Sequence, residues 1–475
     1  MKVTPIDYDI VTREIKESGL KNISKASIRE VRHLINNIEK ATGKRFIRME
    51  MGVPGLPTPS IAVDGEIQAL KSGKSAIYPE LDGVKELKYE IMRFVKNFLD
   101  LSVKPEHCFP VVGSAQGGFI TFLTIDRLYE DKNTIVFIDP GFPLQKQQIK
   151  VLGQKYENFD VYNFRGNKLK DKLEAYFKKG NVHSVLYNNP NNPTWICFTD
   201  EELQIIGSLA NKYNIIVIED LAYLGMDFRK DYSQPAKPPF QPTVGKYTDN
   251  FILLISSSKM FSYAGQRCGM MVISDKVFNI RSSALKRYFT SDCLGYCMLY
   301  GTLYAASSGV SHTAQYGLAS VLKAVTDGTY NYRNDVIEYG EKAKIMKKLF
   351  LENGFKIVYD KDGDEPIADG FYFTISYPGL SAEELLREFL YYGISAISLD
   401  ITGSESTEGI RACVSLVQRS QFPDLEERLK KFKEQQDETE YLLQSEANRK
   451  MLLESIKQAE RGELIKVNIG KAKKK

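Results

Sequence analysis

The chain has 475 residues, of which 43% are hydrophobic and 26% charged, and its formal net charge at pH 7 is +4. This length is too great for one ordinary single-core domain, and the composition is that of a folded protein rather than of a disordered one. Positive and negative charges nearly balance. Apart from four lysines among residues 471–475, no basic cluster favours nucleic acid as a partner.

The N-terminus and the cysteines indicate where the protein works. The first residues lack the apolar core of a signal peptide, and no run of about 18 apolar residues could cross a membrane. The six cysteines form no CxxC pair and the four histidines form no spaced ligand set. We therefore expect reduced thiols, no metal site and a cytoplasmic protein without a membrane partner.

Residues 51–325 are predicted to form a large α/β domain, preceded by a helical segment, residues 1–50, that contributes to a smaller domain or to a contact between subunits. Six apolar runs alternate with amphipathic stretches, as in a mostly parallel sheet covered by helices on both sides. Functional loops are expected at the carboxyl ends of such strands. The runs are CFPVV (108–112), TIVFID (134–139), VHSVLYNN (182–189), NIIVIED (214–220), FILLISS (251–257) and GMMVIS (269–274).

Local signals mark two helix starts and one loop. Thr199 followed by Glu202, and Ser381 followed by Glu384, each predict a capping box before an apolar-periodic run. Residues 231–249 are rich in proline and are predicted to form a loop between two strands.

A smaller α+β domain is predicted over residues 326–420, because short strands and helices follow one another there in a new pattern. Residues 421–475 are predicted to form a charged helical C-terminal extension, most of it solvated, since its apolar residues are only loosely helical in spacing. Those apolar residues are Leu442, Leu443, Leu452, Leu453 and Ile456. The predicted strands of the small domain are FKIVYD (355–360), FYFTISY (371–377), ISAISL (394–399) and IRACVSL (410–416), with a helix at 381–393.

Four segments carry the strongest functional signal: GSAQGG (113–118), NNPNNPTW (188–195), EDLAY (219–223) and SSSKMFSYAGQR (256–267). Each alone is weak. Together they resemble the class I/II aminotransferases, which are fold type I enzymes that use pyridoxal phosphate (PLP), and the resemblance extends from about Met51 to about Leu416. It implies that the large domain at 51–325 binds PLP.

The resemblance implies that Lys259 holds PLP as a Schiff base. A lysine beside a cationic cofactor in a partly buried site has its ammonium form disfavoured, so it can act as a nucleophile and later move a proton. Taken by itself, a lysine at the end of a strand is more often a surface residue.

Three further residues match positions around the PLP ring. Asp220 matches the aspartate that pairs with the pyridinium nitrogen and so keeps the ring an electron sink. Tyr223 and Asn192 match the two partners of the ring's phenolic oxygen. Lys259, Asp220 and Tyr223 are the predicted catalytic residues, although an aspartate after a strand is about as often a helix N-cap.

The phosphate of PLP is expected at the glycine-rich segment. Backbone amides at the start of the following helix can point at a phosphate, and an arginine with two serine hydroxyls would complete the site. In isolation, such a segment is more often only a turn. The predicted phosphate-binding residues are Ser114, Ala115, Gln116, Ser256, Ser258 and Arg267.

Two aromatic residues complete the implied cofactor site. Phe142 corresponds to the residue that stacks on the pyridine ring, although core packing is the commoner role of a phenylalanine. Tyr78 matches the tyrosine that reaches the phosphate of the neighbouring subunit's cofactor. The resemblance therefore implies a homodimer with shared active sites.

The resemblance also implies the substrate-binding residues. Arg411 matches the arginine that binds the α-carboxylate through a bidentate pair, which makes amino acids and 2-oxo acids the substrates. Asn192 and Gly52 would lie near the same carboxylate. Gly52 could also be only a loop glycine that needs a positive φ.

One residue departs from the family pattern. Trp195, the only tryptophan of the chain, stands where the NPxNPTG segment of the family usually has glycine. If that position needs a positive φ, a tryptophan opposes it. We expect Trp195 either to line the pocket or to pack beneath it.

The predicted activity is PLP-dependent transfer of an amino group between an L-amino acid and a 2-oxo acid. The same residues would also support a C–S β-lyase or an amino acid decarboxylase. The alternative outside the enzymes is a non-catalytic regulator that binds PLP. The identity of the amino donor stays open. Pocket residues could also come from the aromatic-rich stretch at 292–304, whose aromatic residues are more often core.

Overall fold

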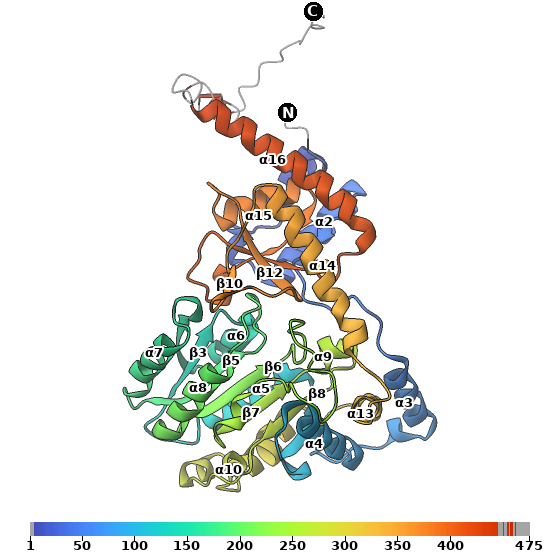
Figure 1. Ribbon diagram of the computed structural model, residues 1–475, viewed down its shortest axis with the longest axis vertical. Coiled ribbons are helices and arrows are strands. Elements are labelled where there is room, and N and C mark those ends of the chain that lie inside the picture. Colours follow the sequence, from blue (N-terminus) through green and yellow to red (C-terminus); the bar gives the residue numbers. More distant parts are fainter. Residues whose placement is uncertain (1–3, 445–449, 451–453, 456, 459–460, 462–475) are drawn as a thin grey trace, which may run out of the picture.

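The computed structural model describes residues 4–444, 450, 454–455, 457–458 and 461. Figure 1 shows two lobes, a large lower one and a smaller upper one that is crossed by α16 (Phe422–Gln444). Among these residues, no helix combines the length and the apolar character needed to cross a membrane.

A seven-stranded sheet in the order β2-β8-β7-β6-β5-β3-β4 forms the centre of the large lobe. Five strands pair in parallel, whereas β8 runs antiparallel to both of its neighbours. The predicted mostly parallel sheet and its six predicted strands are therefore confirmed. The strands are β2 (Cys108–Val111), β3 (Thr134–Asp139), β4 (Lys155–Asp160), β5 (Val182–Asn188), β6 (Ile216–Leu221), β7 (Phe251–Ile255) and β8 (Gly269–Ile273).

Edge strand β4 was not predicted, because its sequence KYENFD contains no apolar run. Only its last two residues, Phe159 and Asp160, are buried. A strand at a sheet edge, with one neighbour and a solvated flank, needs few apolar residues.

Alternate residues of the central strands face two separate cores. In β6, Val217 belongs to one core and Ile218 to the other, because successive side chains of a strand point to opposite faces. Helices cover both faces, as predicted. The first face is covered by α4 (Lys85–Leu99), α7 (Asn167–Phe177), α8 (Asp200–Tyr213) and α13 (His312–Thr326), and the second by α5 (Gly113–Ile125), α6 (Pro143–Val151) and the π-helix Cys297–Leu303.

Several shorter elements complete the large lobe. Helix α3 (Ser60–Lys71) packs along α13. The predicted capping box of Thr199 and Glu202 is present at the start of α8, and residues 231–249 form the predicted connection between β6 and β7. The remaining short helices are α9 (Ser257–Met260), α10 (Asp275–Phe278), α11 (Leu294–Tyr296) and α12 (Tyr304–Ser307).

The small lobe is built on a four-stranded sheet in the order β14-β15-β12-β9. The capping box predicted at Ser381 and Glu384 starts its helix α15. The elements are α14 (Arg333–Glu352), β9 (Lys356–Ile357), β10 (Lys361–Asp362), β11 (Glu365–Pro366), β12 (Tyr372–Ser376), α15 (Ala382–Tyr391), β13 (Ile394–Ser395), β14 (Ile397–Ser398) and β15 (Ile410–Cys413).

The N-terminal segment packs on this small lobe. Strand β1 (Ile47–Arg48) pairs in parallel with β13, and the backbone amide of Ile6 donates to the carbonyl of Tyr391. The ring of Tyr8 stacks on Tyr391 at a centroid distance of 4.6 Å. Helices α1 (Tyr8–Glu17) and α2 (Ile28–Thr42) thereby join the small lobe, although they lie at the other end of the sequence.

Helix α16 begins the predicted C-terminal extension. Its residues Leu425, Leu429 and Phe432 are fully buried against the small lobe, so this part has an apolar face that the sequence reading did not identify. Leu452, Leu453 and Ile456 lie outside the described residues, as do the side chains of Leu442 and Leu443.

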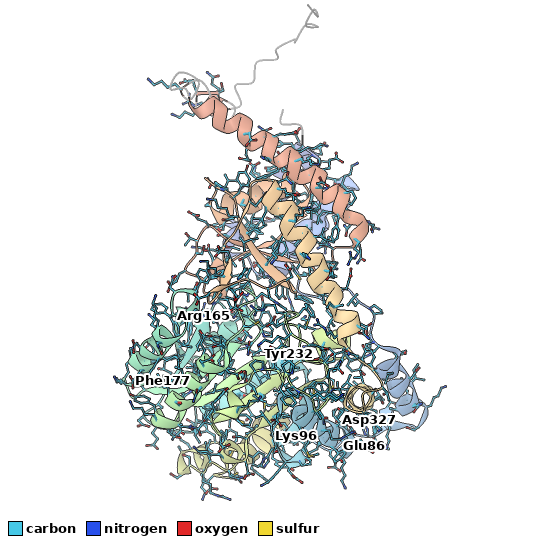
Figure 2. All side chains as sticks on the ribbon, in the orientation of Figure 1. Glu86, Lys96, Arg165, Phe177, Tyr232 and Asp327 are labelled. Atoms are coloured by element: carbon cyan, nitrogen blue, oxygen red, sulfur yellow. The ribbon has the colours of Figure 1, made fainter. Side chains whose placement is uncertain are left out.

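Ion pairs and hydrogen bonds join the two lobes. Arg165, which Figure 2 shows at the boundary between them, donates to Glu202 of the large lobe and to Asp362 of the small lobe, at 2.7 and 2.8 Å. The hydroxyl of Tyr359 bonds to the carboxylate of Asp160. These contacts fix the small lobe over the carboxyl ends of the central strands.

Candidate functional site

A cavity of about 280 Å³ lies where the carboxyl ends of β5, β6 and β7 meet the small lobe. The large lobe contributes the ends of three strands and the first turn of α5, and the small lobe contributes β12 and β15. The lining residues are Ile28, Met51, Gly52, Val53, Ser114, Ala115, Phe142, Leu144, Asn188, Asn192, Asp220, Ala222, Tyr223, Ser256, Ser258, Lys259, Arg267, Tyr372 and Arg411.

Twelve of the predicted site residues line this one cavity. The sequence places them up to 359 positions apart, and the fold brings them together. They are Gly52, Ser114, Ala115, Phe142, Asn192, Asp220, Tyr223, Ser256, Ser258, Lys259, Arg267 and Arg411.

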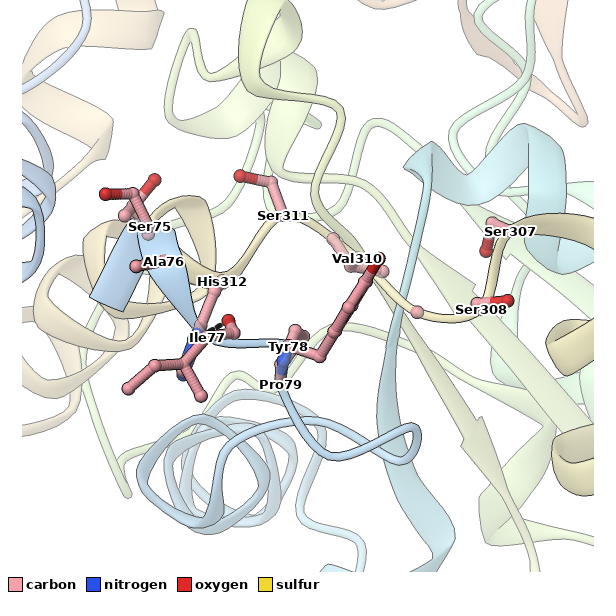
Figure 3. A pocket seen from close by; sticks show the side chains of 12 residues that line it. Ser75, Ala76, Ile77, Tyr78, Pro79, Ser307, Ser308, Val310, Ser311 and His312 are labelled. Atoms are coloured by element: carbon pink, nitrogen blue, oxygen red, sulfur yellow. Dashed lines mark hydrogen bonds between the residues drawn. The ribbon is translucent and has the colours of Figure 1, made fainter. Parts of the chain in front are cut away.

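Two predicted residues, Gln116 and Tyr78, do not line the cavity. The side-chain oxygen of Gln116 accepts from the backbone of Val112 at 2.7 Å, and its amide donates to Ser307. Tyr78 is 91% exposed and lies at a separate surface hollow formed by residues 75–79 and 307–313 (Figure 3).

Lys259 follows β7 in the short helix α9 and points into the cavity. Its ammonium donates to the carbonyl oxygen of Gly52. Burial is the main cause that lowers the pKa of Lys259 to about 8; Cys413 acts in the opposite direction, and the positive charges of Arg411 and Arg267 add to the lowering. Much of the amine is therefore neutral near pH 8, as a nucleophile requires.

Asp220 lies near the carboxyl end of β6, lines the cavity and is 4% exposed. Its Oδ2 accepts from the amides of Gln145 and Asn188 at 2.8 and 2.7 Å, and its Oδ1 accepts from the backbone of Ala222. Burial raises the pKa of Asp220 to about 6, although these three hydrogen bonds act in the opposite direction. No cationic side chain of the described residues pairs with it, so this buried carboxylate can receive a cationic ligand.

A cluster of donors surrounds the start of α5. Gly113 has a φ of 68°, and a Cβ at this position would overlap Nη2 of Arg267, so only glycine lets the guanidinium lie this close to the turn. Ser114 and Ala115 follow in the first turn of the helix, where backbone amides lack intrahelical acceptors. Such a helix start with an adjacent guanidinium suits a phosphate group.

Arg411 of β15 lies at the opposite side of the cavity and is 1% exposed. Its Nη1 donates to Oδ1 of Asn192 at 3.3 Å, and its Nη2 donates to the carbonyl of Glu50 at 2.6 Å. The Nε of Arg411 is buried without a partner among the described residues. A guanidinium that is held in this way can bind a carboxylate.

Two tyrosine side chains form one wall of the site, and a tryptophan packs behind them. The hydroxyls of Tyr223 and Tyr372 are 2.7 Å apart, and the indole of Trp195 lies edge-on to both rings at centroid distances of 5.4 and 6.3 Å. Trp195 has a φ of 67° and is fully buried, yet it does not line the cavity. The backbone thus keeps the left-handed conformation, and the indole packs beneath the pocket, one of the two expected outcomes.

Seven lining residues were not predicted. Asn188 lies within a segment already singled out, so its place at the end of β5 could have been found. Tyr372 lies in a strand whose residues are all buried, so the sequence does not reveal which of them face the pocket. Ile28 comes from α2, far from the motifs, and carries no sequence signal.

The aromatic-rich stretch at 292–304 does not line the cavity. Its apolar residues, such as Met298 and Leu303, lie in the second core, whereas Tyr296, Tyr300 and Tyr304 are 45–60% exposed on the surface.

Comparison with known families gives one match over much of the chain. The model of the family described as aminotransferase class I and II matches residues 45–317. A probable aspartate aminotransferase of Methanocaldococcus jannaschii is 25% identical over 356 residues, which cover 71% of this chain and 88% of that protein. An LL-diaminopimelate aminotransferase of Natranaerobius thermophilus is 26% identical over 68% of this chain and 76% of its own length.

Solved structures show the same fold. An aspartate aminotransferase of Thermotoga maritima superposes with a TM-score of 0.68 at 19% identity, covering 88% of this chain and 99% of that chain. An alanine aminotransferase of Pyrococcus furiosus gives a TM-score of 0.69 at 18% identity, with the same coverage.

Proposed function

The chain belongs to the aminotransferase class I and II family, whose members use PLP to move an amino group between an amino acid and a 2-oxo acid, and we propose that Lys259, Asp220 and Arg411 carry this reaction. The observation that supports these roles is that the three side chains line one cavity, although they come from α9, β6 and β15. A nucleophilic amine, a carboxylate that can pair with a cation and a guanidinium that can bind a carboxylate thus line the same cavity.

The pocket suits PLP in charge and in shape. Asp220, a buried carboxylate without a cationic partner among the described residues, fits a protonated ring nitrogen. The turn at Gly113, against which the guanidinium of Arg267 packs, fits the phosphate. The Nε of Arg411, which has no hydrogen-bond partner in the part of the chain that the structure describes, leaves a donor for a substrate carboxylate.

The chemistry divides between the cofactor and the chain. When bound, PLP supplies an aldehyde that reacts with amines and a ring that withdraws electrons from the substrate. Lys259, whose pKa is about 8, is able to accept a proton from the α-carbon of the substrate and to return it. Arg411 binds and orients the α-carboxylate, and Asn192 orients Arg411.

A substitution at Lys259 tests this assignment. Lys259→Ala is expected to lose activity, to lose the visible absorbance of lysine-bound PLP, and to yield no borohydride-trapped adduct. Lys276→Ala on the surface is the control and is expected to keep all three. A trapped adduct on another lysine of the Lys259→Ala protein would remove Lys259 from its role.

Product analysis separates transfer from the two other reactions that this site could support. A transaminase needs a stoichiometric 2-oxo acid acceptor to turn over. Release of ammonia and pyruvate without an acceptor would indicate a β-lyase, and release of carbon dioxide would indicate a decarboxylase. We expect turnover only with an acceptor.

The exposed apolar surface supports a homodimer. Large apolar side chains of α3 and its neighbour segment are unusually exposed, including Leu70 (49%), Ile77 (61%) and Tyr78 (91%). Tyr296, Tyr300 and Tyr304 add to the exposed aromatic surface. Since clusters of exposed apolar side chains mark interaction sites, we assign this face to a second copy of the chain. Tyr78 would then reach the partner's cofactor.

Mixed dimers test the shared site. Tyr78→Ala and Lys259→Ala subunits, mixed and allowed to exchange, would form dimers in which one of the two sites has both native residues. We expect that site in the mixed dimers to bind PLP as tightly as the wild type does. The Tyr78→Ala protein alone is expected to bind PLP more weakly. No gain on mixing, or a monomer by sedimentation, would contradict the shared site.

The state of the six cysteines supports a location in a reducing compartment. All six are free thiols, and five are buried. Because free cysteines persist where glutathione keeps thiols reduced, we assign the protein to the cytoplasm.

A further inference from the structure

The side chains of Tyr223 and Tyr372 contact each other at the wall of the site. Their hydroxyl oxygens are 2.7 Å apart, and the two side chains are 3% and 2% exposed. Tyr223 lies just after β6 in the large lobe, and Tyr372 begins β12 in the small lobe. The contact therefore joins the two lobes inside the pocket.

A hydroxyl has one proton, so its donor and acceptor roles are linked. If Tyr223 donates its proton to the phenolic oxygen of the PLP ring, it can no longer donate to Tyr372. The hydrogen bond between the tyrosines must then run from Tyr372 to Tyr223.

We propose that Tyr372 is a positioning residue that donates to the hydroxyl of Tyr223 and thereby strengthens the hydrogen bond of Tyr223 to the ring oxygen. The proposal rests on the role of Tyr223 in the proposed function. A hydroxyl that accepts a hydrogen bond becomes a better donor, because hydrogen bonds in a chain polarise one another.

The surroundings hold Tyr372 in this position. The guanidinium carbon of Arg411 lies 4.6 Å from the centroid of its ring, and the indole of Trp195 packs against it from the side. A Cβ at Gly52 would overlap the Tyr372 hydroxyl, so only glycine there leaves room for it. The ring cannot turn away without displacing these neighbours.

Both hydroxyls stay protonated over the working pH range. Burial raises the pKa of Tyr223 and of Tyr372 well above the ordinary value, and the charge of Arg411 acts in the opposite direction. The other titratable groups that face the two hydroxyls are Cys413 on β15 and, across the pocket, Lys259 on α9.

The test is the pH midpoint of the visible absorbance change of lysine-bound PLP. A donor to the ring oxygen stabilises the oxygen's negative charge and so lowers this midpoint. Tyr372→Phe keeps the ring but loses the hydroxyl, and we expect the midpoint to rise by about 0.5 to 1 pH unit, the size of one hydrogen bond. Tyr339→Phe is the control, because the buried hydroxyl of Tyr339 bonds the backbone of Gly55 instead.

A double variant shows whether Tyr372 acts through Tyr223. We expect Tyr223→Phe to raise the midpoint by more, and Tyr372→Phe to add nothing in that background, since coupled residues are not additive. An unchanged or lowered midpoint in Tyr372→Phe, or full additivity in the double variant, would overturn the proposal. An unchanged midpoint in Tyr223→Phe would instead refute the role given to Tyr223.

A second substitution guards against a folding defect. Tyr372→Met removes the same hydroxyl with a flexible side chain that fills irregular space. We expect its midpoint to move in the same direction as that of Tyr372→Phe. A shift in the opposite direction would count against the proposal.

Discussion

Gly370 lies directly against the indole of Trp195, so that a Cβ added at Gly370 would overlap Cε2 of that ring. Both residues are buried behind the aromatic wall of the pocket, and Gly370 precedes Phe371 and Tyr372 on the way into β12. The unusual tryptophan and this glycine are therefore a matched pair. The space that the indole occupies is available because residue 370 has no side chain.

Gly370→Ala is expected to destabilise the protein. The added methyl group must displace a fully buried indole, and overpacking of this kind costs about 1 to 3 kcal/mol. The measurement is the thermal unfolding midpoint, with Gly265→Ala as the control, because a Cβ there would meet nothing within 4 Å. Equal midpoints for the two variants would contradict the pairing.

Trp195→Gly is expected to offset the defect of Gly370→Ala. Glycine adopts the φ of 67° at position 195 without strain, and loss of the indole makes room for the new methyl group. Trp195→Gly alone is expected to destabilise the protein by leaving a cavity. If the double variant lost more stability than the two single variants lose together, the two residues would not share this space.

Lys259 is expected to react with an acylating reagent in the PLP-free protein with a pH midpoint of about 8. Burial disfavours the ammonium form, so the amine loses its proton at lower pH than an ordinary lysine, whose pKa is about 10.4. Peptide mass spectrometry after short exposures would give the rate at each pH, and the unfolded chain is the reference. A midpoint for Lys259 equal to that in the unfolded chain would contradict the prediction.

Arg411→Lys is expected to raise the KM for amino acid donors about 10- to 100-fold. A single ammonium cannot reproduce the two parallel hydrogen bonds of a guanidinium, and a lost charged hydrogen bond costs about 1.5 to 3 kcal/mol. Steady-state kinetics with one donor and one acceptor would measure the change. Arg419→Lys, an exposed residue paired with Glu338, is the control. Similar KM values for the two variants would remove Arg411 from carboxylate binding.

The sequence predicted the central sheet because its strands are apolar on both faces, and it predicted the cofactor side of the pocket because those residues lie in recognisable segments at strand ends. It did not predict Tyr372 or Ile28. Their side chains reach the cavity only through the packing of the small lobe and the N-terminal segment on the large lobe, which is a long-range relationship. Likewise, the sequence showed that Trp195 is unusual, but not that Gly370, 175 positions later, makes room for it.

The affinity for PLP is expected to fall as the pH drops below about 6, because of Asp220. Burial raises the pKa of this carboxyl in the PLP-free protein to about 6, so below that pH it holds a proton that must leave before it can pair with the ring nitrogen. The loss approaches tenfold per pH unit as the protonated form becomes dominant. Fluorescence titration of PLP from pH 5 to 8 would measure it.

Asp220→Asn isolates the contribution of Asp220 to this pH dependence, because an asparagine side chain does not titrate. We expect the variant to bind PLP about 10- to 100-fold more weakly at pH 8, because a charged hydrogen bond is lost. Between pH 5 and 7 we expect the variant not to show the loss of PLP affinity that protonation of Asp220 causes in the wild type. The ionisations of PLP itself are common to both proteins and cancel in the ratio of their affinities. A ratio that stays constant across this range would show that Asp220 carries no charge that matters for the cofactor.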